Sequence, residues 1–469
     1  MSVSSLSLWL LPLVLLLHPN CTADESRVEW VYPTQFGERR FVDVGDGQWL
    51  LLFPNGNRAA CVELERTADY IAVRNLDTTN VHRLFTDRGT VQKKGVGNFG
   101  KFADGKWISP TAPASSDYLV RLVYFVPKDR QPIPGFEQRI QAVTELSLET
   151  FTNALRTTGA ATNGPEFARD DEGNLKVQLV LGEKNARAYS GLPQKESPTH
   201  AKFVAEAVEE QLGDTRRYAV VIFSETYETG PAAKVFPGVV NVAVAKPPLG
   251  GRVVVTAWML RDEFCAGSPE ALRHQFFDST PVVGRSTYGI NAANAPKGEL
   301  MEEAYGAIVH ELGHLFGCWH HRTNPTNIMG GGFRDIRWNV GVKRNPRGQA
   351  GFSKENSWLL MTSRFLNPDV DRTDNVQPTL DAQLSTSRDN ILIRMNVHDD
   401  KGLAFACVVD ESDKGGLIML DARKLTGATE QIQFRVPRRD LNNPESKLML
   451  VAVDTGGNFR KLSKPQPGQ

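Results

Sequence analysis

Hydrophobic residues recur in short runs along the first hundred residues, with turn-forming positions between them. The runs at residues 41–44, 49–53 and 71–73 are rich in β-branched and aromatic residues, and Asp46 and Gly47 form a turn signal between the first two. This pattern predicts a small β-domain over residues 24–108. Residues 109–117 contain the sequence SPTAPASS, whose Pro, Ala and Ser content is typical of a linker.

Beyond residue 117 the pattern changes to strands that alternate with long helical stripes. Strand patterns occupy residues 118–126, 218–224, 239–245 and 252–259, and a long helix is predicted from Glu299 to Gly317. This order predicts an α/β domain with a twisted mixed sheet over residues 118–368. A first helix is predicted from apolar positions that share one helix face and end near Gly159: Phe136, Ile140, Val143, Leu146, Phe151, Ala154 and Leu155. A half-buried strand is predicted from apolar residues at every second position: Leu175, Val177, Leu179 and Leu181.

The last hundred residues return to an alternating pattern. Ile391, Ile393, Met395 and Val397 occupy every second position, and similar runs follow at 417–420, 432–436 and 448–453. The pattern predicts a β-sandwich over residues 369–469, immunoglobulin-like or fibronectin-like. Residues 452–458 are similar to the final strand and turn of bacterial domains of that kind.

An apolar run at residues 6–17 is too short to cross a bilayer comfortably and has the length of a signal-peptide core. We predict a signal peptide over residues 1–23, cut after Ala23, and a secreted, periplasmic or cell-surface protein. An uncleaved membrane anchor is the alternative. No later segment is apolar enough to be transmembrane.

Composition narrows the classes of partner. The chain has 41% hydrophobic and 23% charged residues, and its 54 basic and 54 acidic residues give a formal net charge of zero. This balance argues against nucleic acid as a general partner, which would need a basic surface. Cleavage of the signal peptide would remove Cys21 and leave Cys61, Cys265, Cys318 and Cys407. These four cysteines could form disulfides or be buried as free thiols. If a disulfide forms, Cys265 and Cys318 are the preferred pair.

The candidate chemistry lies in residues 309–330, VHELGHLFGCWHHRTNPTNIMG, where His310, Glu311, His314, Gly317 and His320 have the spacing HExxHxxGxxH. Residues four apart share one face of a helix, so the first two histidines can reach one metal ion. The glycine permits a sharp turn that returns the third histidine to the same ion. Three protein ligands leave a position for water, and the glutamate next to the first ligand can serve as a base.

This motif, followed by Met329, resembles the metzincin metallopeptidases, with the matrixin-like spacing. The order of strands and helices from residue 118 resembles their catalytic domain. The resemblance implies a Zn²⁺-dependent endopeptidase whose ligands are His310, His314 and His320, whose general base is Glu311, and whose tight turn carries Met329 beneath the metal. It also implies a protein or peptide substrate that pairs with an edge strand. Residues 239–245 are the candidate strand, with an interior position as the alternative.

Several alternatives remain at this level. Three glycines, Gly330 to Gly332, follow Met329, so the additional tyrosine ligand of some branches of the family is not expected. His321 is expected to face solvent or to support the metal ligands. The protein could be a zinc-bearing adhesion protein on an inactive scaffold, or could hydrolyse a non-peptide amide. Cys61 could cap the metal as part of an inhibitory pro-region, although a packed cysteine is preferred. Residues 170–174 are an acidic turn that could bind calcium, with a plain turn preferred.

Overall fold

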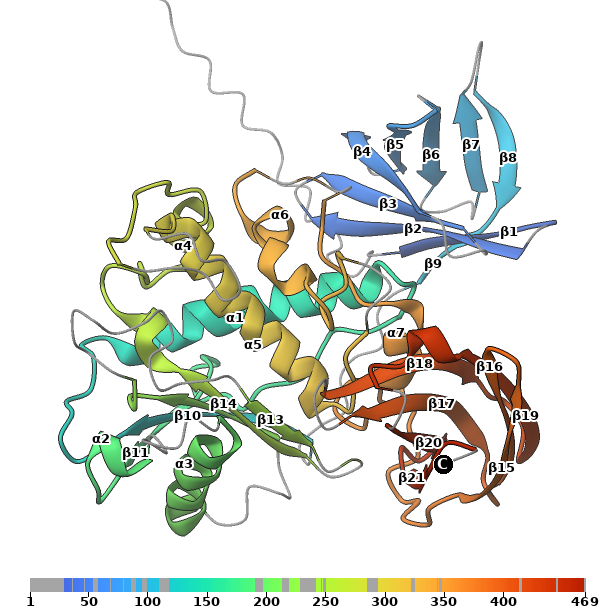
Figure 1. The fold of residues 1–469 in the computed structure, drawn as a ribbon. Helices are drawn as coiled ribbons and strands as arrows, with labels where there is room; N and C mark the ends of the chain where they lie inside the picture. The colour runs from blue at the N-terminus through green and yellow to red at the C-terminus, as the bar shows by residue number, and fades with distance from the viewer. Residues whose placement is uncertain are drawn as a thin grey trace, which may run out of the picture.

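The computed structural model shows a mostly β protein with three sheet-containing parts around a helical centre (Figure 1). It describes residues 29–35, 37–45, 47–53, 58–67, 69–78, 80–85, 90–94, 99–108, 118–189, 197–212, 219–227, 242–245, 247, 250–284, 294–321, 325–343, 345, 348–412, 416–443 and 446–467. The predicted signal peptide and the predicted linker lie outside these residues. No helix among them is long and apolar enough to cross a membrane.

The N-terminal part is one antiparallel sheet of nine strands that follow one another in space almost in chain order, with β9 returning to pair with β1. Trp30, Phe41 and Trp49 are fully buried and form its core, together with Cys61. The runs predicted as strands fall in β2, β3 and β5. The strands are β1 Glu29–Thr34, β2 Gly37–Gly45, β3 Gln48–Leu52, β4 Arg58–Arg66, β5 Tyr70–Asn75, β6 Val81–Phe85, β7 Thr90–Lys94, β8 Gly100–Asp104 and β9 Lys106–Ile108.

The central part is a mixed sheet in the order β11-β10-β12-β14-β13, in which β13 alone runs antiparallel to its neighbour. Figure 1 shows α1 and α5 on one face and α2 and α3 on the other. The elements are β10 Val120–Val126, α1 Phe136–Arg156, β11 Val177–Leu181, α2 Ala186–Tyr189, α3 Ser197–Leu212, β12 Ala219–Ser224, β13 Val242–Ala245, β14 Gly251–Thr256, η2 Ala257–Leu260, α4 Pro269–Gln275, α5 Lys297–Leu315, η3 Gly332–Asp335, α6 Arg337–Val340 and α7 Lys354–Leu360.

Alternate residues of the central strands feed two cores, which explains the continuous apolar runs. Leu122 and Val221 pack toward α1 and α5, whereas Val123 and Ile222 pack toward α2 and α3. Every residue of β12 is buried, as expected for an interior strand covered on both faces. The helix α3 was not predicted, and the strand predicted over residues 252–259 ends at Thr256, whose side chain accepts a hydrogen bond from the Trp258 amide and starts η2.

The alternation predicted through Leu175, Val177, Leu179 and Leu181 is wrong in its second half. Leu179 and Leu181 are 40% and 57% exposed, whereas Val180 between them is buried. The reason is that β11 is an edge strand: α1 covers the face of Leu175 and Val177, but farther along the strand only the opposite face is covered, by the core around α2 and α3. Alternation in the sequence separates the residues of such a strand into two faces, but it does not show which face packs against other elements.

The C-terminal part is a sandwich of a three-stranded sheet, β15-β16-β19, and a four-stranded sheet, β18-β17-β20-β21. The run at residues 448–453 is the penultimate strand rather than the last, because the turn after it leads into β21. The elements are β15 Thr379–Ser387, β16 Asn390–His398, β17 Leu403–Ser412, β18 Gly416–Lys424, β19 Thr429–Pro437, η4 Arg438–Asp440, β20 Lys447–Asp454 and β21 Phe459–Lys464.

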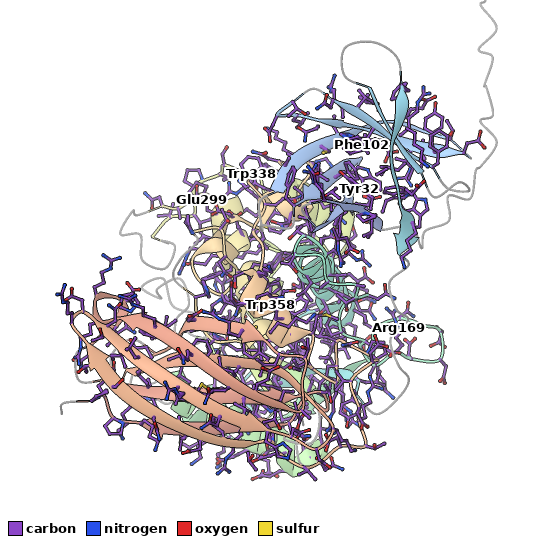
Figure 2. All side chains as sticks on the ribbon, turned by 90° about the vertical axis from the view of Figure 1, so that its right-hand side faces the viewer. Tyr32, Phe102, Arg169, Glu299, Trp338 and Trp358 are labelled. Carbon is purple, nitrogen blue, oxygen red and sulfur yellow. The ribbon has the colours of Figure 1, made fainter. Side chains whose placement is uncertain are left out.

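The central part and the sandwich share one of their cores. Trp319 and Leu359 from the central part pack with Phe405, Val451 and Phe459 of the four-stranded sheet. In Figure 2, Trp358 of α7 lies between the helices and the sandwich strands. The sandwich is therefore packed against the segment that follows α5.

All four cysteines in the described residues are free and buried, so the preferred bridge between Cys265 and Cys318 is wrong and the buried-thiol alternative holds. Cys61 lies in the core of the N-terminal sheet, which removes it as a cap on the metal. Burial raises the pKa of the Cys61 thiol to about 12. In the acidic turn, the Asp170 carboxylate accepts the backbone amides of Glu172 and Asn174, as in an ordinary turn.

Candidate metal centre

The helix α5 carries the first two histidines of the motif. Nineteen residues long, it is buried on nearly all sides, and its first turn follows Pro296, which has no amide hydrogen to leave unpaired. His310 and His314 are one turn apart and their Nε2 atoms lie 3.1 Å from each other. The spacing of the motif and the helix that the sequence predicts thus bring these two rings together as expected.

The third histidine returns to the same point through a turn at the end of α5. Gly317 has φ +104°, a conformation that glycine adopts without strain, and the Cys318 amide donates to the Gly313 carbonyl oxygen. His320 then lies with its Nε2 atom 3.1 Å from His314 Nε2. Ligand atoms of the three histidines all lie within 4.8 Å of one another.

The backbone of His320 is held by the C-terminal sandwich. Its amide donates to the Leu417 carbonyl oxygen at 3.2 Å, and its own carbonyl oxygen accepts from the Met419 amide at 2.9 Å. His320 and Ile418 of β18 therefore form an isolated parallel bridge. A segment about a hundred residues away in the chain fixes the last ligand, and the motif gives no sign of it.

Two of the histidines have their Nδ1 atoms fixed by backbone carbonyls. His310 Nδ1 lies 2.7 Å from the Ile328 oxygen, and His314 Nδ1 lies 2.8 Å from the Cys318 oxygen. A carbonyl only accepts, so Nδ1 carries the proton and Nε2 presents its lone pair to the shared centre. Burial lowers the pKa of His310 to about 4 and lowers the pKa values of His314 and His320, so all three rings are neutral at neutral pH.

This donor set fits a zinc ion. Imidazole nitrogens bind zinc at about 2.0–2.1 Å in tetrahedral geometry, which places two such nitrogens about 3.3 Å apart. The observed separations of 3.1 Å are close to that value. Lone pairs that converge at this distance repel one another unless a cation lies between them.

Met329 lies beneath α5 in a tight turn. Its amide donates to Asn327 Oδ1 at 2.9 Å, and the Gly330 amide donates to the Asn327 carbonyl oxygen at 2.9 Å. Met329 is fully buried, and a Cβ atom built on Gly313 would lie 2.4 Å from its sulfur. The turn also supplies the Ile328 carbonyl that orients His310, so it supports the ligands as well as filling the core.

Glu311 lies on the same helical turn as His310 and is 8% exposed. A carboxylate that is buried to this extent, one residue after a candidate ligand in the chain, has a chemical or structural task rather than one in solubility. His321, the other candidate next to His320, does not face solvent. It is 9% exposed, its amide donates to the Met329 carbonyl oxygen, and burial lowers the pKa of its ring.

Sequence reasoning missed two buried acids that fasten α5 to the segment after Met329. Glu303 accepts from Arg334 Nε at 2.9 Å, and Glu302 accepts from Arg337 Nε at 2.6 Å and from the Arg337 amide at 2.8 Å. The pairing holds η3 against α5, where the Phe333 ring centroid lies 5.0 Å from that of His310. The sequence pattern that could have indicated these ion pairs is the presence of two consecutive glutamates within a helix that is otherwise buried.

Gly306 allows this close approach, and its replacement should be costly. A Cβ atom at Gly306 would lie 1.7 Å from the Phe333 carbonyl oxygen. In an isolated helix Gly→Ala stabilises by about 1 kcal/mol. Here we expect Gly306→Ala to destabilise the protein by at least about 1–3 kcal/mol, because α5 and η3 must separate. Urea or thermal unfolding measures the change.

Gly100→Ala is the matched control, since a Cβ atom there meets nothing within 4 Å. Its unfolding free energy should stay within about 0.5 kcal/mol of the parent. Equal stability of the two variants would contradict the packing described for α5.

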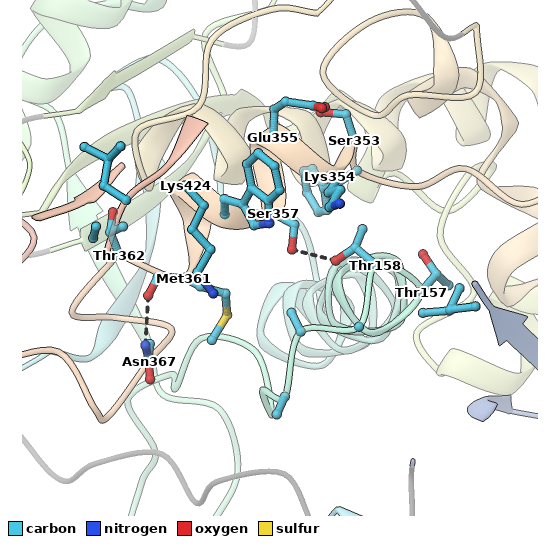
Figure 3. A pocket seen from close by; sticks show the side chains of 18 of the residues that line it. Thr157, Thr158, Ser353, Lys354, Glu355, Ser357, Met361, Thr362, Asn367 and Lys424 are labelled. Atoms are coloured by element: carbon cyan, nitrogen blue, oxygen red, sulfur yellow. Dashed lines mark hydrogen bonds between the residues drawn. The ribbon is translucent and has the colours of Figure 1, made fainter. Parts of the chain in front are cut away.

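A cavity of about 1110 Å³ lies where the three parts of the chain meet (Figure 3). Its wall includes Arg40 of β2, Thr158 after α1, Lys354 of α7 and Lys424 of β18. Thr158 and Ser357 hydrogen-bond across one side of it, as Figure 3 shows. His321 belongs to its lining, whereas His310, His314 and His320 do not, so this cavity is separate from the histidine cluster.

No family model matches this sequence, and no curated protein matches it at the level of sequence. Among solved structures, the chain is similar to OgpA from Akkermansia muciniphila. A catalytically inactive OgpA in complex with an O-glycopeptide substrate, glycodrosocin, has a TM-score of 0.52 at 14% identity, over 76% of this chain and 95% of that one. Two crystal forms of wild-type OgpA have TM-scores of 0.50 at 14% and 15% identity, over 76% of this chain and 95% and 94% of theirs. At this identity the likeness shows a shared fold.

Proposed function

We propose that this protein is an exported zinc-dependent endopeptidase of the metzincin type. The single observation that carries the proposal is the convergence of the His310, His314 and His320 rings. Two of their Nδ1 atoms are fixed by backbone carbonyls, and His314 Nε2 lies 3.1 Å from Nε2 of each of the other two. Neutral, buried imidazoles arranged in this way are the ligand set of a catalytic zinc site, which keeps its fourth position for water.

The roles of the residues follow from this arrangement. His310, His314 and His320 would hold the ion, which when bound would supply Lewis acidity toward a water molecule and a substrate carbonyl. Glu311 would take up the proton that the water gives up and would pass it to the leaving amine. The turn at Met329 keeps His310 oriented through the Ile328 carbonyl, and β18 keeps His320 in place.

The proposed substrate is a peptide in an extended conformation. The strand β13 lies at the end of the central sheet and pairs with β14 alone among the described strands, which favours an edge over the interior alternative. It lies beside α5, the helix that carries His310 and His314. An extended peptide can add to such an edge through backbone hydrogen bonds. Because OgpA is bound to an O-glycopeptide in a structure of the same fold, peptides with O-linked sugars are the first substrates to compare.

Removal of the metal tests the proposal. We expect the purified chain to contain one zinc ion and to cleave peptides, to lose activity when stripped with a chelator, and to regain it when zinc is returned. The assay compares one peptide with and without an O-linked glycan and identifies the new termini by mass spectrometry. Cleavage by protein shown to be free of metal would refute the mechanism. Bound zinc with no cleavage of either peptide would favour the zinc-bearing adhesion protein.

A further inference from the structure

Three aspartates form a second cluster, far along the chain from the histidines. Asp374 lies in the connection before β15, Asp399 in the turn after β16, and Asp454 at the end of β20. Their side chains are 1%, 3% and 0% exposed, and one carboxylate oxygen from each lies within 4.8 Å of the others. Three carboxylates withdrawn from water at this separation are strongly unfavourable without a positive charge.

The hydrogen bonds around the cluster leave two oxygens unsatisfied. Asp399 Oδ1 accepts the amides of Lys401 and Gly402, and Asp374 Oδ1 accepts the amide of Val376. The second oxygens, Asp374 Oδ2 and Asp399 Oδ2, are buried and have no hydrogen-bond partner within the described part of the chain. Buried oxygens of this kind are satisfied by an ordered water molecule or by an ion.

Two basic groups close to the cluster in the chain or in the fold, Lys401 and Arg364, make their hydrogen bonds to other partners. Lys401 Nζ forms its ion pair with Asp371 Oδ2 at 3.1 Å, and it also interacts electrostatically with Asp374 of the cluster. The Arg364 guanidinium donates to the backbone oxygens of Gly456 and Asp374 and to Asn458 Oδ1. Asp454 Oδ1 accepts the Asn458 amide at 2.8 Å, and Asp454 Oδ2 accepts from Asn458 Nδ2 at 3.0 Å.

We propose that Asp374, Asp399 and Asp454 bind a calcium ion at the junction between the central part and the sandwich. All three side-chain ligands are oxygens, the donors that hard cations prefer, whereas zinc favours nitrogen and sulfur. Calcium–oxygen distances of about 2.3–2.6 Å allow two ligands on opposite sides of the ion to be about 5 Å apart, which accommodates the observed limit of 4.8 Å. Asp454 and Thr455 also belong to the wall of the 1110 Å³ cavity, from which water could complete the coordination.

The position of the cluster gives the ion a structural task. Arg364, which follows α7, joins the backbone oxygens of Asp374 and Gly456, so the end of the central part and the β20–β21 turn are already tied at this point. The same sandwich holds His320 through β18. An ion at the cluster would strengthen the docking of the sheet that fixes the last histidine, without taking part in the chemistry at the histidines.

Calcium titration of the full chain tests the site independently of its activity. The protein is stripped of metal, reloaded with one equivalent of zinc, and its Tm measured as CaCl2 is added. We expect one calcium ion per chain by calorimetry and a rise in Tm of about 5 °C at saturation. Asp399→Asn keeps the oxygen that accepts the Lys401 and Gly402 amides but loses a charge, so it should fold and show no such rise.

Asp371→Asn is the control, because Asp371 is an exposed carboxylate of the same connection that lies outside the cluster. It should keep the full calcium response. Should Asp399→Asn fail to fold, Asp374→Asn takes its place, since its remaining oxygen also keeps the backbone bond to Val376. No calcium-dependent rise in the parent protein, an equal rise with magnesium, or an undiminished rise in the folded cluster variant would overturn the proposal, whether or not the protein proves to be a peptidase.

Discussion

Glu311→Gln is expected to lower kcat for peptide cleavage by about 10²–10⁴-fold while bound zinc remains at one ion per chain. A thousandfold loss corresponds to about 4 kcal/mol of transition-state stabilisation. The reason is chemical: the amide of Gln has nearly the shape of the carboxylate but cannot take up a proton at neutral pH. Glu311 is buried on the helical turn of His310, so an isosteric change should leave the packing of α5 intact. Steady-state cleavage of one peptide and metal analysis of the same sample give both quantities.

Glu299→Gln is the matched control, because it makes the same change in the first turn of the same helix, three turns away from the histidines. Its kcat and zinc content should equal those of the parent. If Glu311→Gln cleaved at the parental rate, the base would be another group. If it lost zinc as well, Glu311 would have a role in holding the ligands.

His320→Asn is expected to weaken zinc binding by more than about 100-fold and to abolish cleavage. Loss of a partner that merely orients a zinc ligand costs about 10–100-fold in metal affinity, so loss of a ligand itself should cost more. His320 Nε2 lies 3.1 Å from His314 Nε2, and without it only the two rings of α5 remain. Zinc titration in competition with a chelator of known affinity measures the change.

The adjacent histidine provides the control. In His321→Asn the three converging rings are untouched, and the His321 amide that donates to the Met329 carbonyl oxygen is part of the backbone and persists. We expect this variant to keep its zinc ion and to show only modest changes in cleavage. The reverse result, with metal lost from the His321 variant and kept by the His320 variant, would show that the ligand had been assigned to the wrong ring.

The sequence predicted much of the local structure around the histidines for a clear physical reason. A spacing of four residues determines which side chains share a helix face, and the pattern around α5 is strongly helical. Gly317 was predicted to turn the backbone, and its φ of +104° is the conformation that the prediction requires. Local interactions decide all of these features, so local sequence contains the information.

Features that depend on contacts between distant segments were predicted poorly. The burial of Leu179 and Leu181 depends on which layer covers the end of an edge strand, and the state of Cys265 and Cys318 depends on how far apart the fold places them. The ion pairs of Glu302 and Glu303 with Arg337 and Arg334 join segments more than thirty residues apart. Charge and hydrophobic pattern along the chain do not specify such partners.

By itself, then, the sequence determined which residues could be ligands, because helix periodicity and one flexible glycine act over a few neighbouring positions. Only the tertiary structure decided that His320 rests on β18, that the Ile328 and Cys318 carbonyls set the ring orientation, and that three aspartates from separate turns meet in one buried place. These arrangements arise where separately folded layers pack together. Packing brings groups from distant segments within hydrogen-bonding distance, and no periodic pattern in the sequence corresponds to these contacts.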